Sequence, residues 1–263
     1  FDGVSKATVS VLIINDTVLS SALKVARKKL EGFTQAPATR AKTDLYQPLS
    51  WAQLIERGYI GHWRISSAAI EQKLGSPLVD YPEASQPDPG EPFAELFFGY
   101  INAPMVGRNL LGDEGFQRLK EKTGPDAQIL AVMSRGLYPH LPDGFTPGSS
   151  PDRLGLQQNS LSLDIRDINV FDQNIQINAD GMPEFARTTL FRVGGNAGFN
   201  PGAEATLKLG VTLRKNHLVA DSTELEIPMA FAQELFEAVE VAPRPEDNRQ
   251  PVWIGLWKER WLT

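Results

Sequence analysis

The sequence predicts an α+β protein in which an N-terminal helical part is followed by an antiparallel, β-sandwich-like domain. Apolar residues at 8–31 recur with helical spacing. From residue 126 onward, several short runs alternate between apolar and polar residues, the period of half-buried strands. Turn-forming Gly, Pro, Asn and Asp separate these runs without intervening helical patterns, which favours an antiparallel sandwich or barrel-like arrangement.

The first predicted helix covers residues 8–31 and has a broad apolar face. Basic residues fill its last turns, where positive charge suits the negative end of the helix dipole. Gly32 stands at the expected C-cap. Asn15 and Asp16 leave open a shorter helix that begins there.

The middle region, 35–125, is predicted to consist of helices and loops. Ser50 occupies the N-cap position of its first helix. Proline and glycine are concentrated at 76–92, which predicts a loop. The strongly apolar and aromatic segment 93–102 fits either a helix or an extended strand. The helices predicted in this region cover residues 51–57, 65–74 and 114–122.

The third region, 126–263, is predicted to be an antiparallel β domain with a C-terminal tail. Residues 160–166 show the cleanest alternation, and the apolar run at 129–133 indicates a buried strand. The segments 179–181 and 200–202 have the composition of tight turns. The predicted strands cover residues 129–133, 160–166, 188–193, 205–213 and 224–229.

The tail contains Trp253, Trp257 and Trp261, spaced four residues apart, with Lys258 and Arg260 among them. Tryptophan together with basic residues suits a membrane–water interface. The same spacing also suits an amphipathic helix that packs on the domain. The sequence leaves both interpretations open.

Composition excludes several classes of function. The 263 residues carry a net charge of −6, which argues against a surface that grips nucleic acid broadly. The absence of cysteine excludes disulfides, thiolate catalysis and cysteine-ligated metals within this stretch. No apolar run approaches the length of a membrane span, and no signal peptide opens the chain. We expect Phe1 to be an internal residue of a larger protein.

The three histidines, His62, His140 and His217, lack the spacing of a metal site. We therefore expect each to be an ordinary surface or partly buried side chain.

A run of small and hydroxylated residues leads directly into the first predicted helix, at positions 2–10. Backbone N–H groups and the positive dipole end at such a helix start form a natural phosphate site. A simple N-cap by Ser5 or Thr8 explains the same pattern, and physical reasoning by itself favours the cap.

This run resembles the Asp-x-x-Ser-Gly-Ala-Thr-x-Thr motif of covalent FMN-binding domains, found in Rnf-type, Na⁺-translocating quinone reductase and NosR-type proteins. The resemblance implies that FMN is held by a phosphoester bond, installed by an ApbE-type flavin transferase. Lys6 stands where those families have Gly, and Ser replaces Thr at the last position. The implied cofactor-binding residues are Asp2, Ser5, Ala7, Thr8 and the ester-forming Ser10.

A second segment, 91–112, is similar to the Tyr-Val-Asn-x-Pro-x-x-Gly-Arg-Asn-Leu-Leu-Gly signature of the NosR/NirI family. Residues 185–201 and 253–261 fit later parts of the same family pattern. The resemblance implies three regions: residues 1–34 as the end of an FMN-binding domain, 35–125 as a helical and loop region, and 126–263 as an antiparallel β domain with a juxtamembrane tail.

The family resemblance also implies a function. The chain would be the periplasmic portion of an inner-membrane flavoprotein that supports nitrous oxide reductase, by electron transfer through FMN or by regulation in denitrification. It would be an electron-transfer module and no stand-alone enzyme. Its implied partners are the periplasmic nitrous oxide reductase or a related reductase, the flavin transferase and the rest of its own membrane chain, with no nucleic acid.

Two alternatives remain open. The first is a docking or sensing module of the same family, NirI-like, that carries no flavin. The second is a ligand-binding β-sandwich with a helical cap, from outside the family. Flavin absorbance would distinguish the electron-transfer module from both.

Arg108 is the lone basic residue among seven carboxylates between positions 76 and 115. We expect it to pair with Glu95, Asp113 or Glu114 in a buried ion pair that pins the helical part to the β part. Asn102 and Asn109 lie in the same apolar stretch, where polar side chains need hydrogen-bond partners.

Overall fold

The computed structural model describes residues 37–84, 91–159, 161–168, 175–194 and 198–239. The predicted helix at 8–31, the motif at 2–10 and the tryptophan-containing tail at 253–261 lie outside these residues.

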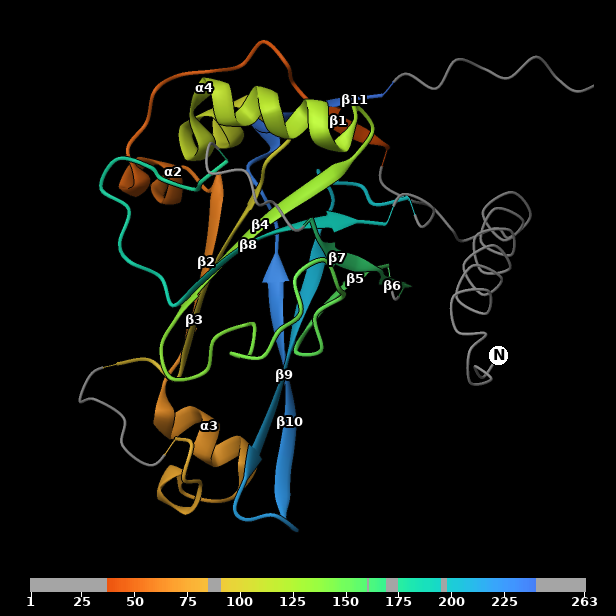
Figure 1. The fold of residues 1–263 in the computed structure, drawn as a ribbon. Coiled ribbons are helices and arrows are strands. Elements are labelled where there is room, and N and C mark those ends of the chain that lie inside the picture. Colours follow the sequence, from red (N-terminus) through yellow and green to blue (C-terminus); the bar gives the residue numbers. More distant parts are fainter. Residues whose placement is uncertain (1–36, 85–90, 160, 169–174, 195–197, 240–263) are drawn as a thin grey trace, which may run out of the picture.

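A five-stranded antiparallel sheet forms the centre of the fold (Figure 1). All seven residues of its second strand, β3, are buried. A strand buried on both faces is mostly apolar, which explains why this segment has no alternating pattern; Glu95 is its one charged residue. In spatial order the strands are β2 (Ile60–Ile65), β3 (Ala94–Tyr100), β4 (Gln128–Arg135), β8 (Arg187–Val193) and β7 (Ile165–Asp167).

A second, four-stranded antiparallel sheet is built on a long hairpin. The two hairpin strands pair over ten residues each, and their inward-facing positions alternate with exposed ones. In spatial order the strands are β10 (Ala220–Met229), β9 (Ala205–Arg214), β5 (Leu154–Gln158) and β6 (Leu161–Leu163).

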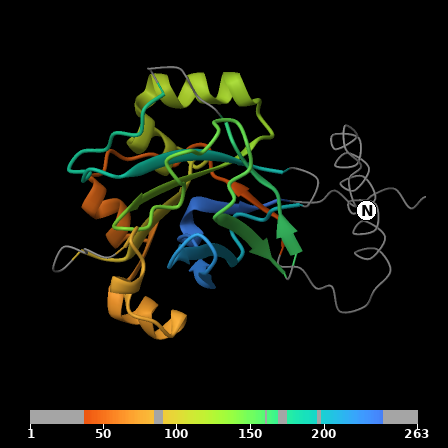
Figure 2. The ribbon, with the colours of Figure 1, turned by 60° about the horizontal axis from the view of Figure 1, so that its bottom comes forward.

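The helix α4 (Pro104–Thr123) and the hairpin β9–β10 lie on opposite sides of the five-stranded sheet (Figure 2). A Cβ placed on Gly99 would touch Val106 and Leu110 of α4. The neighbouring side chains on the other face, Phe98 and Tyr100, contact Phe231, which follows β10. The core therefore has two parts, one under the helices and one between the sheets.

Two shorter helices have the capping residues that their sequences predict. In α2 (Trp51–Glu56), the Ser50 hydroxyl accepts from Gln53 N–H while the Gln53 side chain accepts from Ser50 N–H. The helix α3 (Ser67–Leu74) ends at Gly75, whose φ of +71° suits glycine. It is followed by the short 3₁₀ turn η1 (Leu78–Asp80).

The helix α3 and the turn η1 pack at the far end of the hairpin β9–β10 (Figure 1). Just after η1, the hydroxyl of Tyr81 donates to Asp221 at 2.8 Å, and Lys215 forms an ion pair with the same carboxylate at 3.0 Å. These contacts tie the segment to the tip of the hairpin.

The expected antiparallel β half is confirmed, but the expected N-terminal helical part is wrong for the residues that the structure describes. Helices and strands alternate within 37–125, and β3 from this region pairs directly with β4 from the next. Segment 93–102 is a strand because an apolar run without alternation does not distinguish helix from buried strand. The strand β2 escaped prediction because His62 and Arg64 interrupt one of its faces.

The single strand predicted at 160–166 is two strands in different sheets. Leu161–Leu163 pairs with β5, whereas Ile165–Asp167 pairs with β8. The chain crosses between the sheets at Asp164, whose carbonyl accepts from Gly194 N–H at 2.7 Å. The alternating pattern correctly predicted extended structure, but it does not determine which strand each half pairs with.

The two ends of the described chain meet in a small ribbon, β1 (Thr39–Ala41) paired with β11 (Phe236–Ala238) (Figure 1). The 3₁₀ turn η3 (Gln233–Leu235) leads into β11. Hydrogen bonds extend the pairing on both sides, from Lys42 N–H to Leu235 and from Val239 N–H to Ala38. Residues 1–36 and 240–263 are thus joined to the fold at one place.

His140 is fully buried between β4 and β8. Its Nδ1 lies 2.6 Å from the Ser134 hydroxyl, and its Nε2 lies 3.1 Å from the Thr189 hydroxyl. Burial, reinforced by the positive charge of Arg187, lowers the pKa of this imidazole from 6.5 to about 3. The ring is therefore neutral in the folded protein at neutral pH.

This burial predicts acid sensitivity. Between pH 6.5 and about 3 the unfolded chain binds a proton on His140 and the folded chain does not, so stability falls as the pH drops through this window. We expect the free energy of unfolding to lose about 1.4 kcal/mol per pH unit from this residue.

Urea denaturation at several pH values above 4.5, where carboxylates contribute less, measures this slope. The slope should be shallower in His140→Gln, whatever the variant's stability at neutral pH. Equal slopes in the two proteins would contradict the assignment.

Candidate functional site

The residues implied to hold FMN, namely Asp2, Ser5, Ala7, Thr8 and Ser10, lie outside the described part of the chain. Their placement stays a prediction. The described residues contain three polar clusters that bear on function: the corner between β3 and α4, a clamp at Asn200, and a group of charged side chains on β2, β3 and β4.

The corner between β3 and α4 is held by Asn102. Its Oδ1 accepts from Ile129 N–H and its Nδ2 donates to the Ala127 carbonyl, both at 2.7 Å. The last regular partners of the two strands are Tyr100 and Leu130. Beyond this point the backbone of β3 turns away from β4. The Asn102 side chain then makes the hydrogen bonds to β4 that the backbone would otherwise make.

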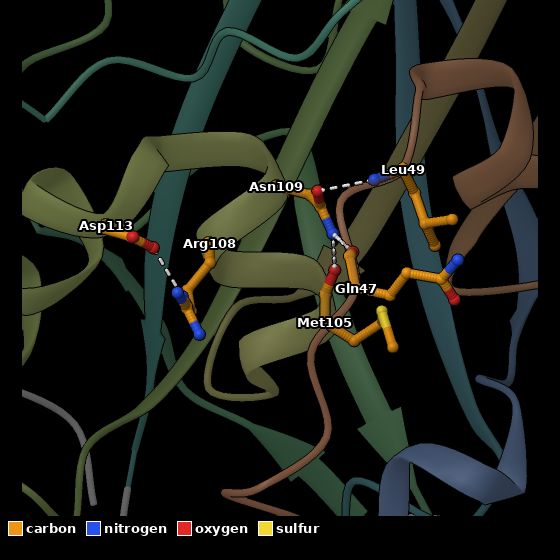
Figure 3. A network of polar contacts seen from close by, with 6 residues as sticks. All are labelled: Gln47, Leu49, Met105, Arg108, Asn109 and Asp113. Carbon is orange, nitrogen blue, oxygen red and sulfur yellow. Dashed lines mark hydrogen bonds and ion pairs between the residues drawn. The ribbon is translucent and has the colours of Figure 1, made fainter.

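Asn109 performs a similar task on α4 (Figure 3). Its Oδ1 accepts from Leu49 N–H at 2.9 Å, and its Nδ2 donates to the carbonyls of Gln47 and Met105, both at 2.8 Å. These bonds attach the segment before α2 to the side of α4. The polar side chains of the signature are thus satisfied by backbone groups, as expected for a structural role.

Two glycines of the signature also have structural causes. A Cβ on Gly107 would lie 2.3 Å from the Ile101 carbonyl oxygen, so only glycine lets α4 approach the corner. Gly112 has φ +69° and breaks the helix. The break leaves the Leu110 carbonyl free to accept from Asn178 N–H at 2.7 Å.

The expectation for Arg108 is correct in its partner and wrong in its burial. Its guanidinium pairs with Asp113 at 2.5 Å, across the break in α4 (Figure 3). It also lies over the ring of Tyr46. The Asp113 side chain is 69% exposed. Such a pair is a surface contact, so Asn102 and Asn109 pin the corner and Arg108 does not.

Asn200 lies in the predicted turn at 200–202 and clamps the start of the described chain. Its Oδ1 accepts from both the backbone N–H and the hydroxyl of Thr39, at 3.1 and 2.5 Å. The Gln158 side chain holds the turn in place by accepting from Asn200 N–H and donating to its carbonyl, both at 2.9 Å. The turn therefore fixes β1, the strand that follows residues 1–36.

The third cluster is centred on Glu95, in the buried strand β3. One carboxylate oxygen lies 2.6 Å from Nε2 of His62 on β2, and the other lies 2.5 Å from Nε of Arg135 on β4. The Glu95 side chain is only 3% exposed, whereas those of His62 and Arg135 are 36% and 45% exposed. A buried anion is thus covered by two side chains that reach the surface.

An aromatic floor supports this group. The imidazole of His62 stacks on Phe97, with centroids 4.4 Å apart and planes inclined by 6°. Phe97 also contacts Trp51 of α2 and Phe185. The stacking and the hydrogen bond to Glu95 together fix the orientation of the ring.

Glu95 is ionised at neutral pH. Its burial opposes the charge, but hydrogen bonds from Arg135 and His62 outweigh burial and lower the pKa of the carboxyl. Because an ionised carboxylate only accepts hydrogen bonds, His62 must donate through Nε2. Its Nδ1 is left as the atom available to other groups.

Sequence reasoning missed this cluster because its members are 33 and 40 residues apart and form no motif. The available signal was a carboxylate inside an apolar strand, which requires a partner. The histidines do not converge, and the described residues contain no group of three potential metal ligands. In the same part of the chain, no helix is long and apolar enough to cross a membrane.

Comparisons with known proteins identify relatives of this chain. The regulatory protein NosR of Stutzerimonas stutzeri is 30% identical to this chain over 273 aligned positions, which cover 98% of this chain and 37% of that protein. NosR of Pseudomonas aeruginosa is 28% identical, again over 98% of this chain. The protein NirI of Paracoccus denitrificans is 28% identical over 99% of this chain.

No family model matches the chain, and no solved structure matches it. The chain spans a little over a third of the length of these relatives. The chain is homologous to the N-terminal third of the NosR and NirI proteins.

The corner predicts different effects for two neighbouring residues of α4. Asn109→Ala removes three hydrogen bonds to backbone groups and should lower the free energy of unfolding by about 1–2 kcal/mol. Arg108→Ala removes an exposed ion pair and should leave the midpoint of urea unfolding nearly unchanged. A greater loss for Arg108→Ala than for Asn109→Ala would show that the arginine pins the corner after all.

Proposed function

We propose that this chain is the periplasmic portion of a NosR-type membrane flavoprotein that supports nitrous oxide reductase, with FMN esterified to Ser10. The observation that carries the proposal is the FMN-type motif at 2–10, inside a chain that is similar to NosR proteins over 98% of its length. The proposal assigns the chain to an electron-transfer module.

In this proposal, the Ser10 hydroxyl oxygen forms a bond to the FMN phosphorus of a flavin dinucleotide supplied to the transferase. The P–O–P bond of the dinucleotide breaks, the nucleoside monophosphate leaves, and the Ser10 proton passes to solvent. The N–H groups at the start of the predicted helix at 8–31 bind the phosphate oxygens, with Ser5 and Thr8 as further donors. FMN would supply redox chemistry that no side chain of this cysteine-free sequence provides. The chain's own task is to hold the flavin and to present it to a partner.

The proposed partners follow from the same assignment. They are an ApbE-type flavin transferase, a periplasmic nitrous oxide reductase or related reductase, and the rest of the membrane chain. The tryptophan and basic residues at 253–261 support a position of the tail next to the membrane. The length of the relatives supports the existence of further protein beyond this region.

A second candidate function is a docking or sensing module without flavin. Two observations favour it: Lys6 occupies the position where glycine is usual, and the similar proteins from the two pseudomonads are named regulatory proteins. A side chain at position 6 restricts backbone conformation and the approach of the transferase. The experiments below separate the two candidates.

Co-expression of the 263-residue chain with a flavin transferase should increase its intact mass by that of FMN less one water. Ser10→Ala should abolish this increase, whereas the matched control Ser20→Ala should keep it. Lys6→Gly should raise the occupancy if the side chain obstructs the transferase. Flavin that remains on denatured Ser10→Ala protein would refute the attachment site.

The role of the flavin is tested in the full-length protein. Ser10→Ala should abolish nitrous oxide reduction in cells while the amount of the reductase stays at its wild-type level. Loss of the reductase itself would favour the regulatory module. Wild-type activity with no flavin attached would contradict the electron-transfer proposal.

A further inference from the structure

The cluster around Glu95 has more hydrogen-bond donors than its own contacts use. Arg135 reaches Glu95 through Nε, so both Nη groups remain for other partners. His62 donates to the same carboxylate through Nε2, so Nδ1 of the neutral ring is an acceptor and only the Nη groups of Arg135 are spare donors. Neither remaining set of atoms has a hydrogen-bond partner in the part of the chain that the structure describes.

Arg64 adds a third basic side chain to this face. It stands directly opposite Glu95 in the β2–β3 register, and Glu95 stands opposite Arg135 in the β3–β4 register. Cross-strand partners project from the same face of a sheet, with Cβ atoms about 5 Å apart. Arg64 is exposed and makes no ion pair within the described residues.

Within the described residues, α4 lies away from this end of the sheet. The helix packs over Gly99 and Ile60, at the opposite end of the same face. The floor beneath the basic groups is the buried Phe97 with the His62 ring stacked on it. The basic side chains therefore project from a rigid, preorganised base, which reduces the entropy lost on binding a ligand.

The charges favour an anion. Glu95 neutralises one arginine, which leaves the positive charge of the other arginine on this group. The whole chain carries −6, so a positive patch runs against the overall balance. Guanidinium groups are suited to bind carboxylate or phosphate oxygens through paired N–H donors.

We propose that Arg64 and Arg135 form a binding site for a small oxyanion, a carboxylate or a phosphate group, with the His62 ring beside it. Glu95 is the positioning residue: it orients the imidazole and one guanidinium and takes no part in contact with the ligand. The site does not depend on the proposed flavin attachment.

Nitrogen-15 NMR of the 263-residue chain tests the site. Sodium phosphate and sodium acetate are titrated separately, with sodium chloride keeping the ionic strength constant. We expect saturable shifts of the His62 imidazole and Arg135 Nε signals. Tighter binding of phosphate would assign the site to phosphate compounds, and tighter binding of acetate would assign it to carboxylates.

Variants decide whether the arginines bind the anion. Arg64→Gln, which does not touch Glu95, should weaken binding about two- to fivefold, the contribution of one exposed ion pair. Arg135→Gln should weaken it further if the variant folds. Arg192→Gln, an exposed arginine on β8 of the same sheet, is the matched control and should bind like the wild type.

Two results would overturn the proposal. One is a shift that chloride reproduces at equal ionic strength, because it would report only screening of surface charge. The other is wild-type affinity in Arg64→Gln, since this arginine has no other role in the described fold.

Discussion

The fold depends on the full burial of β3. This strand has helices on one face and a second sheet on the other, so the backbone groups at its end need hydrogen-bond partners within the protein. The chain also has to turn within three residues, because α4 begins at Pro104. Asn102 solves both problems, because its side chain pairs with the start of β4 while its backbone turns. Pro104 then opens the helix at a position where no N–H is needed.

Electrostatics around β3 follow from which charges are buried. Glu95 is enclosed and requires His62 and Arg135, whereas Arg108 and Asp113 lie at the surface and are largely solvated. The Arg108–Asp113 pair, which the sequence predicted, therefore contributes little to the structure. The contacts of Glu95 with His62 and Arg135 contribute more, because they connect three strands.

The ribbon β1–β11 links the two segments to which the family resemblance gives functions. The FMN-type motif precedes β1, and the tryptophan-containing tail follows β11. Asn200, supported by Gln158, fixes β1 from the other side. The segments before and after the described residues are thus attached next to each other, at one hydrogen-bonded ribbon.

The sequence by itself determined the local features of this protein. Ser50 caps α2, Gly75 ends α3, and the alternating residues of β8, β9 and β10 form antiparallel strands, because these depend on neighbours along the chain. It also carried the family signature. The tertiary structure decided what has no local signal: that segment 93–102 is the buried strand β3, that the alternation at 160–166 is shared between two sheets, and that Glu95 meets His62 and Arg135. Burial and strand pairing depend on residues far apart in the sequence, so only the folded chain fixes them.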